Sequence, residues 1–151
     1  MSIIIGGSPT CRDVPLLGNL VVSKAREYIG TPYYHSGRTK VGGVDCAGLV
    51  IAVFGELGVT ITDTPDHYGR IVSTRQLMRT VRDNLTQVVG GLKEAKAGDV
   101  LTIRFKRHAQ HLAIFTGEGT IIHSYEGSGK VIENRLDDRW QRKIVGVYRY
   151  V

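Results

Sequence analysis

The apolar residues of this chain change their spacing near Gly98, and this change constrains the fold more than any other feature. Before Gly98 they recur at helical intervals, whereas after it they form short runs separated by glycine-rich or charged turns. Helices followed by a run of strands are typical of an α+β domain with an antiparallel sheet. The 151 residues are enough for one domain with a substantial buried core.

Three helices are expected ahead of the strands. The first covers about 19–29, where apolar residues share one face and a glycine and a proline follow. The second starts at Asp45 or Cys46, with Asp45 as the candidate N-cap. The third is indicated at Ser73, because Ser73 and Gln76 have the spacing of a capping box.

About five strands should form the sheet on which the second helix packs. They are predicted at 99–105, 111–116, 120–125, 130–134 and 144–150. Residues 1–17 show no periodicity, so we interpret them as an arm of irregular or edge-strand structure. The domain proper is then expected over 18–151.

The charge of the chain narrows the class of partner only slightly. Twenty Lys and Arg against fourteen Asp and Glu give a net charge of +6, which favours an anionic partner such as nucleic acid, teichoic acid or a carboxylate-rich wall peptide. On charge alone, a soluble basic surface explains the excess better. Because no basic run with interleaved aromatic residues occurs, nucleic-acid binding is not expected.

Cysteine usage and hydropathy exclude further classes. The two cysteines, Cys11 and Cys46, rule out a scaffold with several disulfides and a four-cysteine zinc site, although one disulfide between them stays open. No stretch approaches the length of a membrane span, so membrane insertion is not expected. The first residues lack the features of a signal peptide, which predicts synthesis and release in the cytoplasm.

Cys46 stands at the expected start of a helix, where free backbone N–H groups and the helix dipole favour a thiolate and can steady an oxyanion. A buried structural cysteine is the alternative, and position alone favours it. With an imidazole nearby, the pKa of a reactive Cys46 should lie well below the roughly 8.5 of a free thiol. Cys11 has no helix start or nearby histidine and is interpreted as non-catalytic.

Two histidines lie on neighbouring predicted strands. Because side chains alternate along a strand, His111 shares a face with Ala113, and His123 shares one with Tyr125. With a three-residue loop at 116–118, His111 and His123 would be directly opposite, with Cβ atoms about 5 Å apart. Another loop length would place them diagonally or on opposite faces.

Five short blocks occur in a fixed order between about residues 20 and 150. They are GTPYYHSG from Gly30, GVDCAGLV from Gly43, AGDVL from Ala97, HLAIFTG from His111 and IHS from Ile122. This pattern closely resembles the NlpC family of papain-like cell-wall peptidases. The compact form is also similar to the branch encoded among bacteriophage tail genes.

The resemblance implies a papain-like domain without a cofactor, in which Cys46 is the nucleophile, His111 the general base and His123 the group that orients it. Tyr33 falls where the family has a tyrosine beside the nucleophile, and Asp45 where it has an aspartate near the substrate amine. The implied reaction is hydrolysis of a peptide bond in peptidoglycan stem peptides, typically between D-glutamate and a diamino acid.

The same resemblance implies a tail-associated hydrolase located in the virion, with other tail-tip proteins as partners. The alternative is a structural tail-tip component with a vestigial cleft. Retention of the cysteine and both histidines counts against that alternative.

Two departures from the family pattern concern the substrate side. Ala47 stands where many relatives have serine, and His35-Ser36 replaces the usual aromatic-glycine pair. A zinc site built from His108, His111 and other ligands is not expected, because residues three apart on a strand point to opposite faces.

Overall fold

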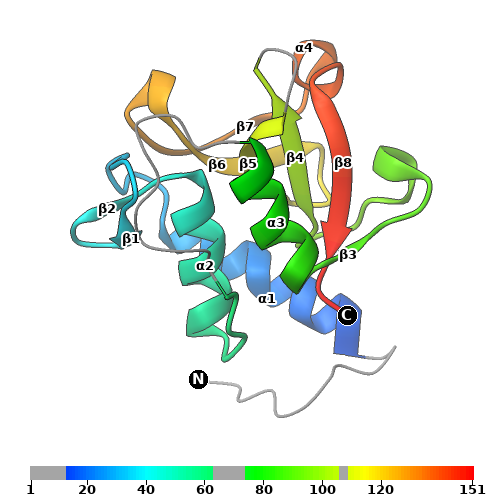
Figure 1. Cartoon of the computed structure of the whole chain (residues 1–151), viewed down its shortest axis with the longest axis horizontal. Coiled ribbons are helices and arrows are strands. Elements are labelled where there is room, and N and C mark those ends of the chain that lie inside the picture. Colours follow the sequence, from blue (N-terminus) through cyan, green and yellow to red (C-terminus); the bar gives the residue numbers. More distant parts are fainter. Residues whose placement is uncertain (1–12, 63–73, 106–108) are drawn as a thin grey trace.

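Six strands form one antiparallel sheet in the order β3-β8-β4-β5-β6-β7 (Figure 1). This computed structural model describes residues 13–62, 74–105 and 109–151. The strands are β3 (Thr86–Gln87), β4 (Val100–Arg104), β5 (Ala109–Phe115), β6 (Thr120–Tyr125), β7 (Lys130–Arg135) and β8 (Ile144–Arg149). A separate two-stranded ribbon, β1 (Arg38–Thr39) and β2 (Gly43–Val44), leads into the second helix.

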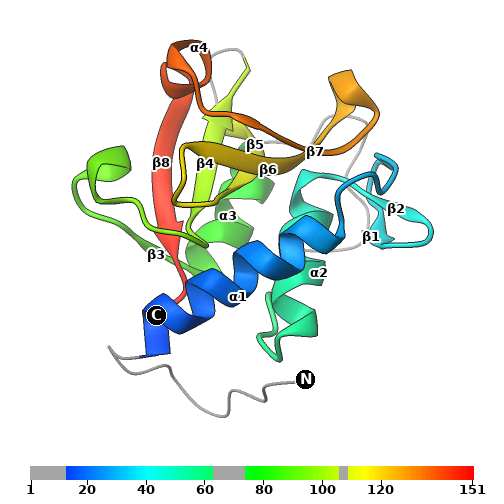
Figure 2. The same cartoon turned by 180° about the vertical axis from the view of Figure 1, so that it is seen from behind.

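The helices are α1 (Asp13–Glu27), α2 (Cys46–Glu56), α3 (Thr74–Asn84) and the short α4 (Asp138–Gln141), with 3₁₀ turns at η1 (Gly91–Glu94) and η2 (Glu126–Ser128). α1, α2 and α3 all contact β5, the strand near the middle of the sheet. The view from behind shows α1 passing below β6 and β7, with α4 at the opposite end of the molecule (Figure 2). No helix of the described ranges is long and apolar enough to cross a membrane.

The two faces of the sheet bury different clusters. Leu112 and Ile114 of β5 belong to a large core that also contains α1, α2 and α3 side chains. Ala113, which points the other way, belongs to a smaller core with Ile121, beside Trp140 of α4. His111 follows the alternation of Ala113, so its side chain belongs to the smaller, aromatic side of the sheet.

The α+β expectation and the five long strands are confirmed, each within two residues of its predicted ends. The additional strand β3 has only two residues, too few to produce a periodic signal. The third helix is also confirmed as α3. The predicted capping residue Ser73 lies outside the described residues.

The first helix begins at Asp13, six residues before its predicted start near 19. Pro15 and Gly18 obscured this start, because both residues usually weaken a helix. Proline is tolerated in the first turn, where the backbone N–H groups have no helical partner. At Gly18 an added Cβ would lie 2.1 Å from the carbonyl oxygen of Ala97, so glycine permits α1 to approach the loop before β4.

Candidate active site

Cys46 is the first residue of α2, as predicted. Asp45 is the N-cap, and its Oδ1 accepts a hydrogen bond from the Gly48 N–H at 2.7 Å. The same carboxylate accepts from Arg38 Nη1 and from the Ser36 N–H, each at 2.9 Å. The turn before the helix is therefore fixed by a buried carboxylate that holds three donors of its own chain.

The Cys46 side chain is nearly buried, with 7% of its surface exposed. Its sulfur is within hydrogen-bond reach of two backbone N–H groups, those of Leu112 and Ala47. Leu112 directly follows His111, so the sulfur lies against the β5 backbone beside the histidine. Among the described residues no hydrogen bond joins the Cys46 thiol directly to the His111 ring.

Burial raises the pKa of the Cys46 thiol to about 12, and the charge of Asp45 adds to this rise. The backbone N–H groups and Arg38 oppose it without offsetting it. The prediction of a pKa well below that of a free thiol is therefore wrong for this structure. The helix start does supply donors, but removing the sulfur from water disfavours the thiolate more strongly.

His111 and His123 are hydrogen-bonded to each other, with 2.7 Å between His111 Nε2 and His123 Nδ1. The strands pair Phe115 with Ile121, so His111 lies diagonally from His123 on the same face. The directly opposite register is wrong because the turn closes one residue later than assumed, with the Thr116 N–H donating to the Thr120 carbonyl.

That turn occupies residues 117–119 and contains two glycines at positive φ. Gly117 has a φ of 81° and Gly119 a φ of 78°. This is the left-handed region that glycine adopts without steric cost. The two glycines therefore allow the tight reversal that sets the diagonal register of the histidines.

Three aromatic rings surround the histidine pair. Tyr125 stacks on His123 with ring centroids 5.5 Å apart, while Phe105 lies 5.0 Å from His111 and Trp140 5.1 Å from His123. Burial, and then the proximity of His123, holds the pKa of His111 well below its usual value. Burial also lowers the pKa of His123. Both imidazoles are therefore neutral at neutral pH.

Asn134 of β7 extends this arrangement and was not found from the sequence. Its Oδ1 lies 2.5 Å from His123 Nε2, so the two histidines and the asparagine form one hydrogen-bonded group across β5, β6 and β7. The alternation of Asn134 with Ile132, which pairs with His123, is a signal that could have identified it. Using that signal requires the β6–β7 register, which no local motif specifies.

A model of the NlpC/P60 family matches residues 30–149. The chain belongs to the NlpC/P60 family. Its similarity to the gamma-DL-glutamyl hydrolase of Bacillus subtilis is 28% identity over 97% of this chain and 31% of that protein. Its similarity to the murein DD-endopeptidase MepH of Escherichia coli is 30% identity over 86% of this chain and 45% of that protein. The chain thus spans less than half the length of either relative.

Solved NlpC/P60 structures share the fold. The NlpC/p60 domain of the peptidoglycan hydrolase SagA matches with a TM-score of 0.62 and 27% identity, over 89% of this chain and 98% of that domain. NlpC1 from Trichomonas vaginalis matches with a TM-score of 0.69 and 16% identity, over 99% of this chain and 46% of the other. The second likeness shows the fold alone.

Tyr33 lies near the start of α2, where it bridges to Val44 just before the N-cap. Burial raises the pKa of Tyr33 to about 12, followed in size by the effect of a charge at Cys46. The structure therefore brings Tyr33, Asp45 and Cys46 together. The contact of the Cys46 sulfur with the Leu112 N–H brings the preceding residue, His111, close to this group, and His111 is hydrogen-bonded to His123.

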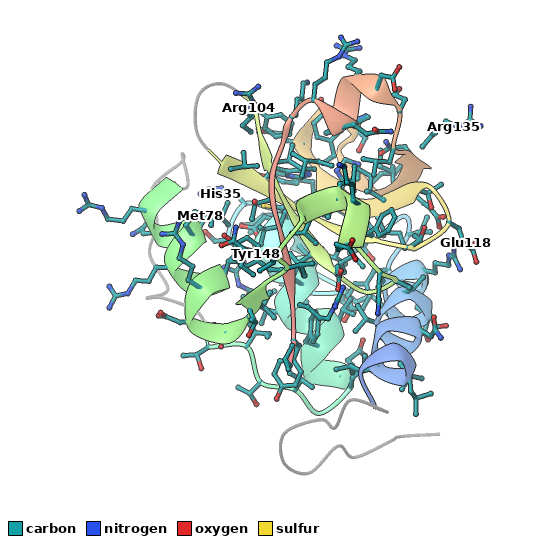
Figure 3. The ribbon with its side chains drawn as sticks, turned by 90° about the vertical axis from the view of Figure 1, so that its right-hand side faces the viewer. His35, Met78, Arg104, Glu118, Arg135 and Tyr148 are labelled. Carbon is teal, nitrogen blue, oxygen red and sulfur yellow. The ribbon has the colours of Figure 1, made fainter. Side chains whose placement is uncertain are left out.

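Several other residues considered from the sequence cannot be placed. Cys46 is a free cysteine, so the disulfide that the sequence left open is not formed. Cys11 and His108 lie outside the described residues, so a zinc set that includes His108 is not described. Within the described ranges, no three His, Cys, Asp or Glu side chains converge as a metal site would require. Arg104 lies at the α4 end of β4, where its Nη2 donates to the Arg142 carbonyl at 3.4 Å (Figure 3).

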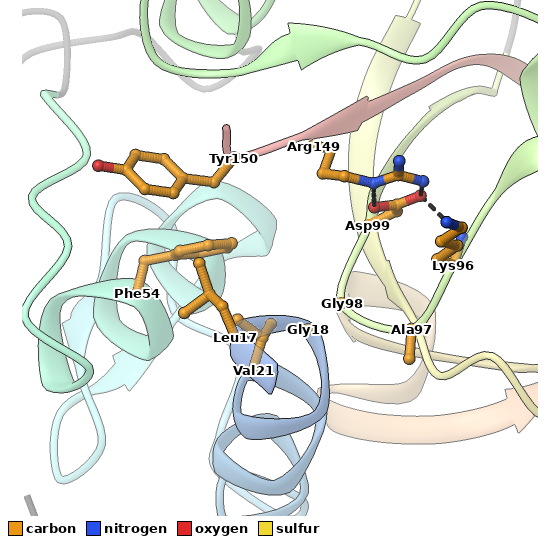
Figure 4. A pocket seen from close by; sticks show the side chains of 10 residues that line it. All are labelled: Leu17, Gly18, Val21, Phe54, Lys96, Ala97, Gly98, Asp99, Arg149 and Tyr150. Carbon is orange, nitrogen blue, oxygen red and sulfur yellow. Dashed lines mark hydrogen bonds and ion pairs between the residues drawn. The ribbon is translucent and has the colours of Figure 1, made fainter. Parts of the chain in front are cut away.

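A separate hollow lies between α1, α2 and the end of β8 (Figure 4). Phe54 and Tyr150 form part of its wall, and Arg149 pairs with Asp99 at 2.8 Å on its rim. Its free volume of about 20 Å³ holds little more than one water molecule. The hollow shares no residue with the Cys46 and His111 group and is too small for a peptide.

Proposed function

We propose that this chain is a cysteine peptidase that hydrolyses a peptide bond in peptidoglycan stem peptides. Cys46 is the nucleophile, His111 the general base and His123 the residue that orients His111. The observation that carries the proposal is the position of the Cys46 sulfur, at a helix N-terminus and against the β5 backbone beside the hydrogen-bonded histidine pair. Relatives named as endopeptidases support the same reaction class.

In the resting state the Cys46 thiol and the His111 imidazole are both neutral, and this determines the order of the proton transfers. As the substrate carbonyl approaches, His111 takes the proton of the Cys46 thiol and the sulfur forms a bond to the carbonyl carbon. The protonated His111 then gives this proton to the leaving amine, and the C–N bond breaks. In the second half, His111 takes a proton from water, whose oxygen attacks the thioester and releases the Cys46 thiolate. The proton held by His111 then returns to that sulfur.

The burial of both groups supports this order of steps. The thiol has a pKa raised to about 12, and the pKa of His111 is lowered, so an ion pair is unfavourable before substrate binds. Charge therefore develops only as the carbonyl is attacked. The N–H groups of Ala47 and Leu112 are already directed at the sulfur, so they favour the thiolate at that moment.

Tyr33 and Asp45 form the proposed substrate side of the cleft. Asp45 is paired with Arg38 and is only 2% exposed, so it would act on a substrate amine mainly through its charge. The bond proposed from the family resemblance joins D-glutamate to a diamino acid. The relatives' names point to two different bonds, a gamma-DL-glutamyl bond and a DD-peptide bond.

Digestion of purified sacculi, followed by mass spectrometry of the released fragments, tests the reaction and identifies the bond. We expect fragments with a new D-glutamate carboxylate and a new diamino-acid amine. Cys46→Ala is the matched control and should release none. Full release by Cys46→Ala would overturn the assignment of the nucleophile.

The proposed setting is a bacteriophage tail, with tail-tip proteins as partners. It is supported by the resemblance of the compact sequence to the tail-encoded branch of the family. Proteomics of purified particles should detect the chain together with tail proteins. Particles that contain those proteins and lack this chain would refute the setting and leave the reaction standing. Intact sacculi after prolonged digestion would instead favour the structural tail-tip alternative.

A further inference from the structure

The side-chain amide of Asn134 is held in one orientation by its own backbone. Its Nδ2 donates to the carbonyl oxygen of Arg135 at 3.0 Å, which leaves Oδ1 facing His123 Nε2. A half-turn of the amide would place Oδ1 against that carbonyl, so two acceptors would face each other and the hydrogen bond would be lost. Asn134 therefore presents an acceptor to His123.

An acceptor at this position determines where both histidines carry their protons. His123 must donate from Nε2, and because a neutral imidazole has one ring proton, its Nδ1 is an acceptor. The short contact of 2.7 Å then requires His111 to donate from its Nε2. The only ring nitrogen of His111 with a free lone pair is Nδ1.

We propose that Asn134 is a positioning residue that fixes the tautomers of His123 and His111, so that His111 Nδ1 stays unprotonated and available to the Cys46 thiol. The proposal rests on the proposed function, in which His111 takes the thiol proton. When Nδ1 accepts that proton, the positive charge on His111 is stabilised through its Nε2–H and His123 Nδ1. No bond to Asn134 is made or broken.

The surroundings keep this relay neutral. Three aromatic rings of the described residues lie against the two histidines, those of Phe105, Tyr125 and Trp140, and none of them carries a charge. Among the described residues, Lys143 lies with its Nζ over the Trp140 and Phe105 rings at 5.4 and 5.8 Å. A cation there disfavours further protonation of the histidines, which agrees with a role for Asn134 as a neutral acceptor.

Two substitutions separate this role from a structural one. Asn134→Leu keeps the number and branching of the side-chain heavy atoms and removes the acceptor, so His123 can adopt either tautomer and kcat should fall about tenfold while KM stays similar. Asn134→Asp keeps the acceptor and adds a charge, which raises the pKa of the pair. A proton added to His111 and His123 occupies His111 Nδ1, the one ring nitrogen left without a proton or a donor, and His111 can then no longer accept the thiol proton. The acid limb of the kcat/KM profile should therefore move up by about one pH unit or more.

Asn84→Leu is the matched control, because Asn84 also makes several hydrogen bonds, with Thr62 and Thr80, but lies on α3. Its loss can lower stability and should leave the acid limb unchanged. If all three variants lower the rate equally and none moves the acid limb, Asn134 has only a structural role.

Nitrogen NMR of ¹⁵N-histidine-labelled protein reads the tautomers without any substrate. The five histidines are assigned by replacing each in turn. In the wild type, His111 and His123 should both carry the proton on Nε2, and Asn134→Leu should mix the tautomers of His123. A wild-type His111 protonated on Nδ1 overturns the proposal even if the enzyme is active. Conversely, predicted tautomers in a protein that cleaves no wall substrate would refute the proposed function and leave the role of Asn134 standing.

Discussion

The two halves of the site are buried to a similar degree but stabilised in different ways. The nucleophile half consists of Arg38, Asp45 and Cys46, and its order depends on an ion pair and a charged N-cap. The histidine half consists of His111, His123 and Asn134, which neutral hydrogen bonds and aromatic contacts hold in place.

This difference shows where burial permits charge. The carboxylate of Asp45 accepts hydrogen bonds from Arg38 and from two backbone N–H groups, which offset the cost of burying it. Within the part of the chain that the structure describes, no oppositely charged side chain is paired with Cys46 or the histidines, so burial favours their neutral forms. The fixed charge is thus structural, and the groups proposed to react remain neutral until substrate arrives.

Removing the proposed base should produce the largest effect. His111→Ala deletes the only proposed acceptor of the thiol proton, so kcat/KM should fall by about 1,000-fold or more. His123→Ala should lower kcat/KM less, because it leaves His111 in place and removes only the residue proposed to orient it. Release of soluble peptide from sacculi measures both, and circular dichroism checks the fold. Equal losses in the two variants would mean that the histidines act as a single unit.

The second prediction distinguishes a neutral Cys46 thiol and His111 imidazole from the thiolate–imidazolium ion pair expected from the sequence. Because burial raises the pKa of Cys46 to about 12, the folded protein should resist iodoacetamide at pH 7 to 9. The unfolded chain should react with a midpoint near the roughly 8.5 of a free thiol. Peptide mapping across a pH series measures the midpoint. Labelling of folded Cys46 at mildly acidic pH would restore the thiolate–imidazolium pair and overturn the neutral resting state.

The contrast between the halves also explains what could be predicted from the sequence. The start of α2 and its cap at Asp45 were predictable because helix termini depend on a few adjacent residues. The shared face of His111 and His123 followed from strand alternation. Their diagonal register did not, because it depends on where the 117–119 turn closes.

Properties that depend on the packed fold were beyond the sequence pattern. Asn134 contributes through the pairing of β6 with β7, eleven residues from His123, and no motif marks it. The pKa of Cys46 has the opposite shift from the one expected, because burial is a property of the whole core. The early start of α1 was hidden by Gly18, whose role is a contact with Ala97 far along the chain.

A third prediction tests the charged half by stability. Asp45→Ala removes the N-cap and the carboxylate that forms the ion pair with the Arg38 guanidinium, so the free energy of unfolding should fall by about 3 kcal/mol. Asp45→Asn keeps a good capping side chain and loses only the charge, so it should fall by about 1 to 2 kcal/mol. Urea titration measures both. Equal losses would show that the charge, and not the cap, stabilises this half.

The last and smallest effect tests the neutral half through the pH dependence of stability. Burial lowers the folded pKa of both histidines, whereas in the unfolded chain they titrate near 6.5. As the pH falls below 6.5, the unfolded state binds protons that the folded state does not, so stability decreases with decreasing pH. Each such proton contributes a slope of about 1.4 kcal/mol per pH unit. Above pH 6.5 this contribution is fully present and the histidines add no further slope.

Urea unfolding at pH 5.0, 5.5, 6.0 and 7.0 measures the slope. His111→Gln is the control, because it should remove the contribution of one histidine to the slope, whatever its effect on stability at pH 7. A wild-type stability that is flat over this range and equal in slope to the variant would mean that the pair is charged in the folded protein, and the histidine half would then resemble the nucleophile half.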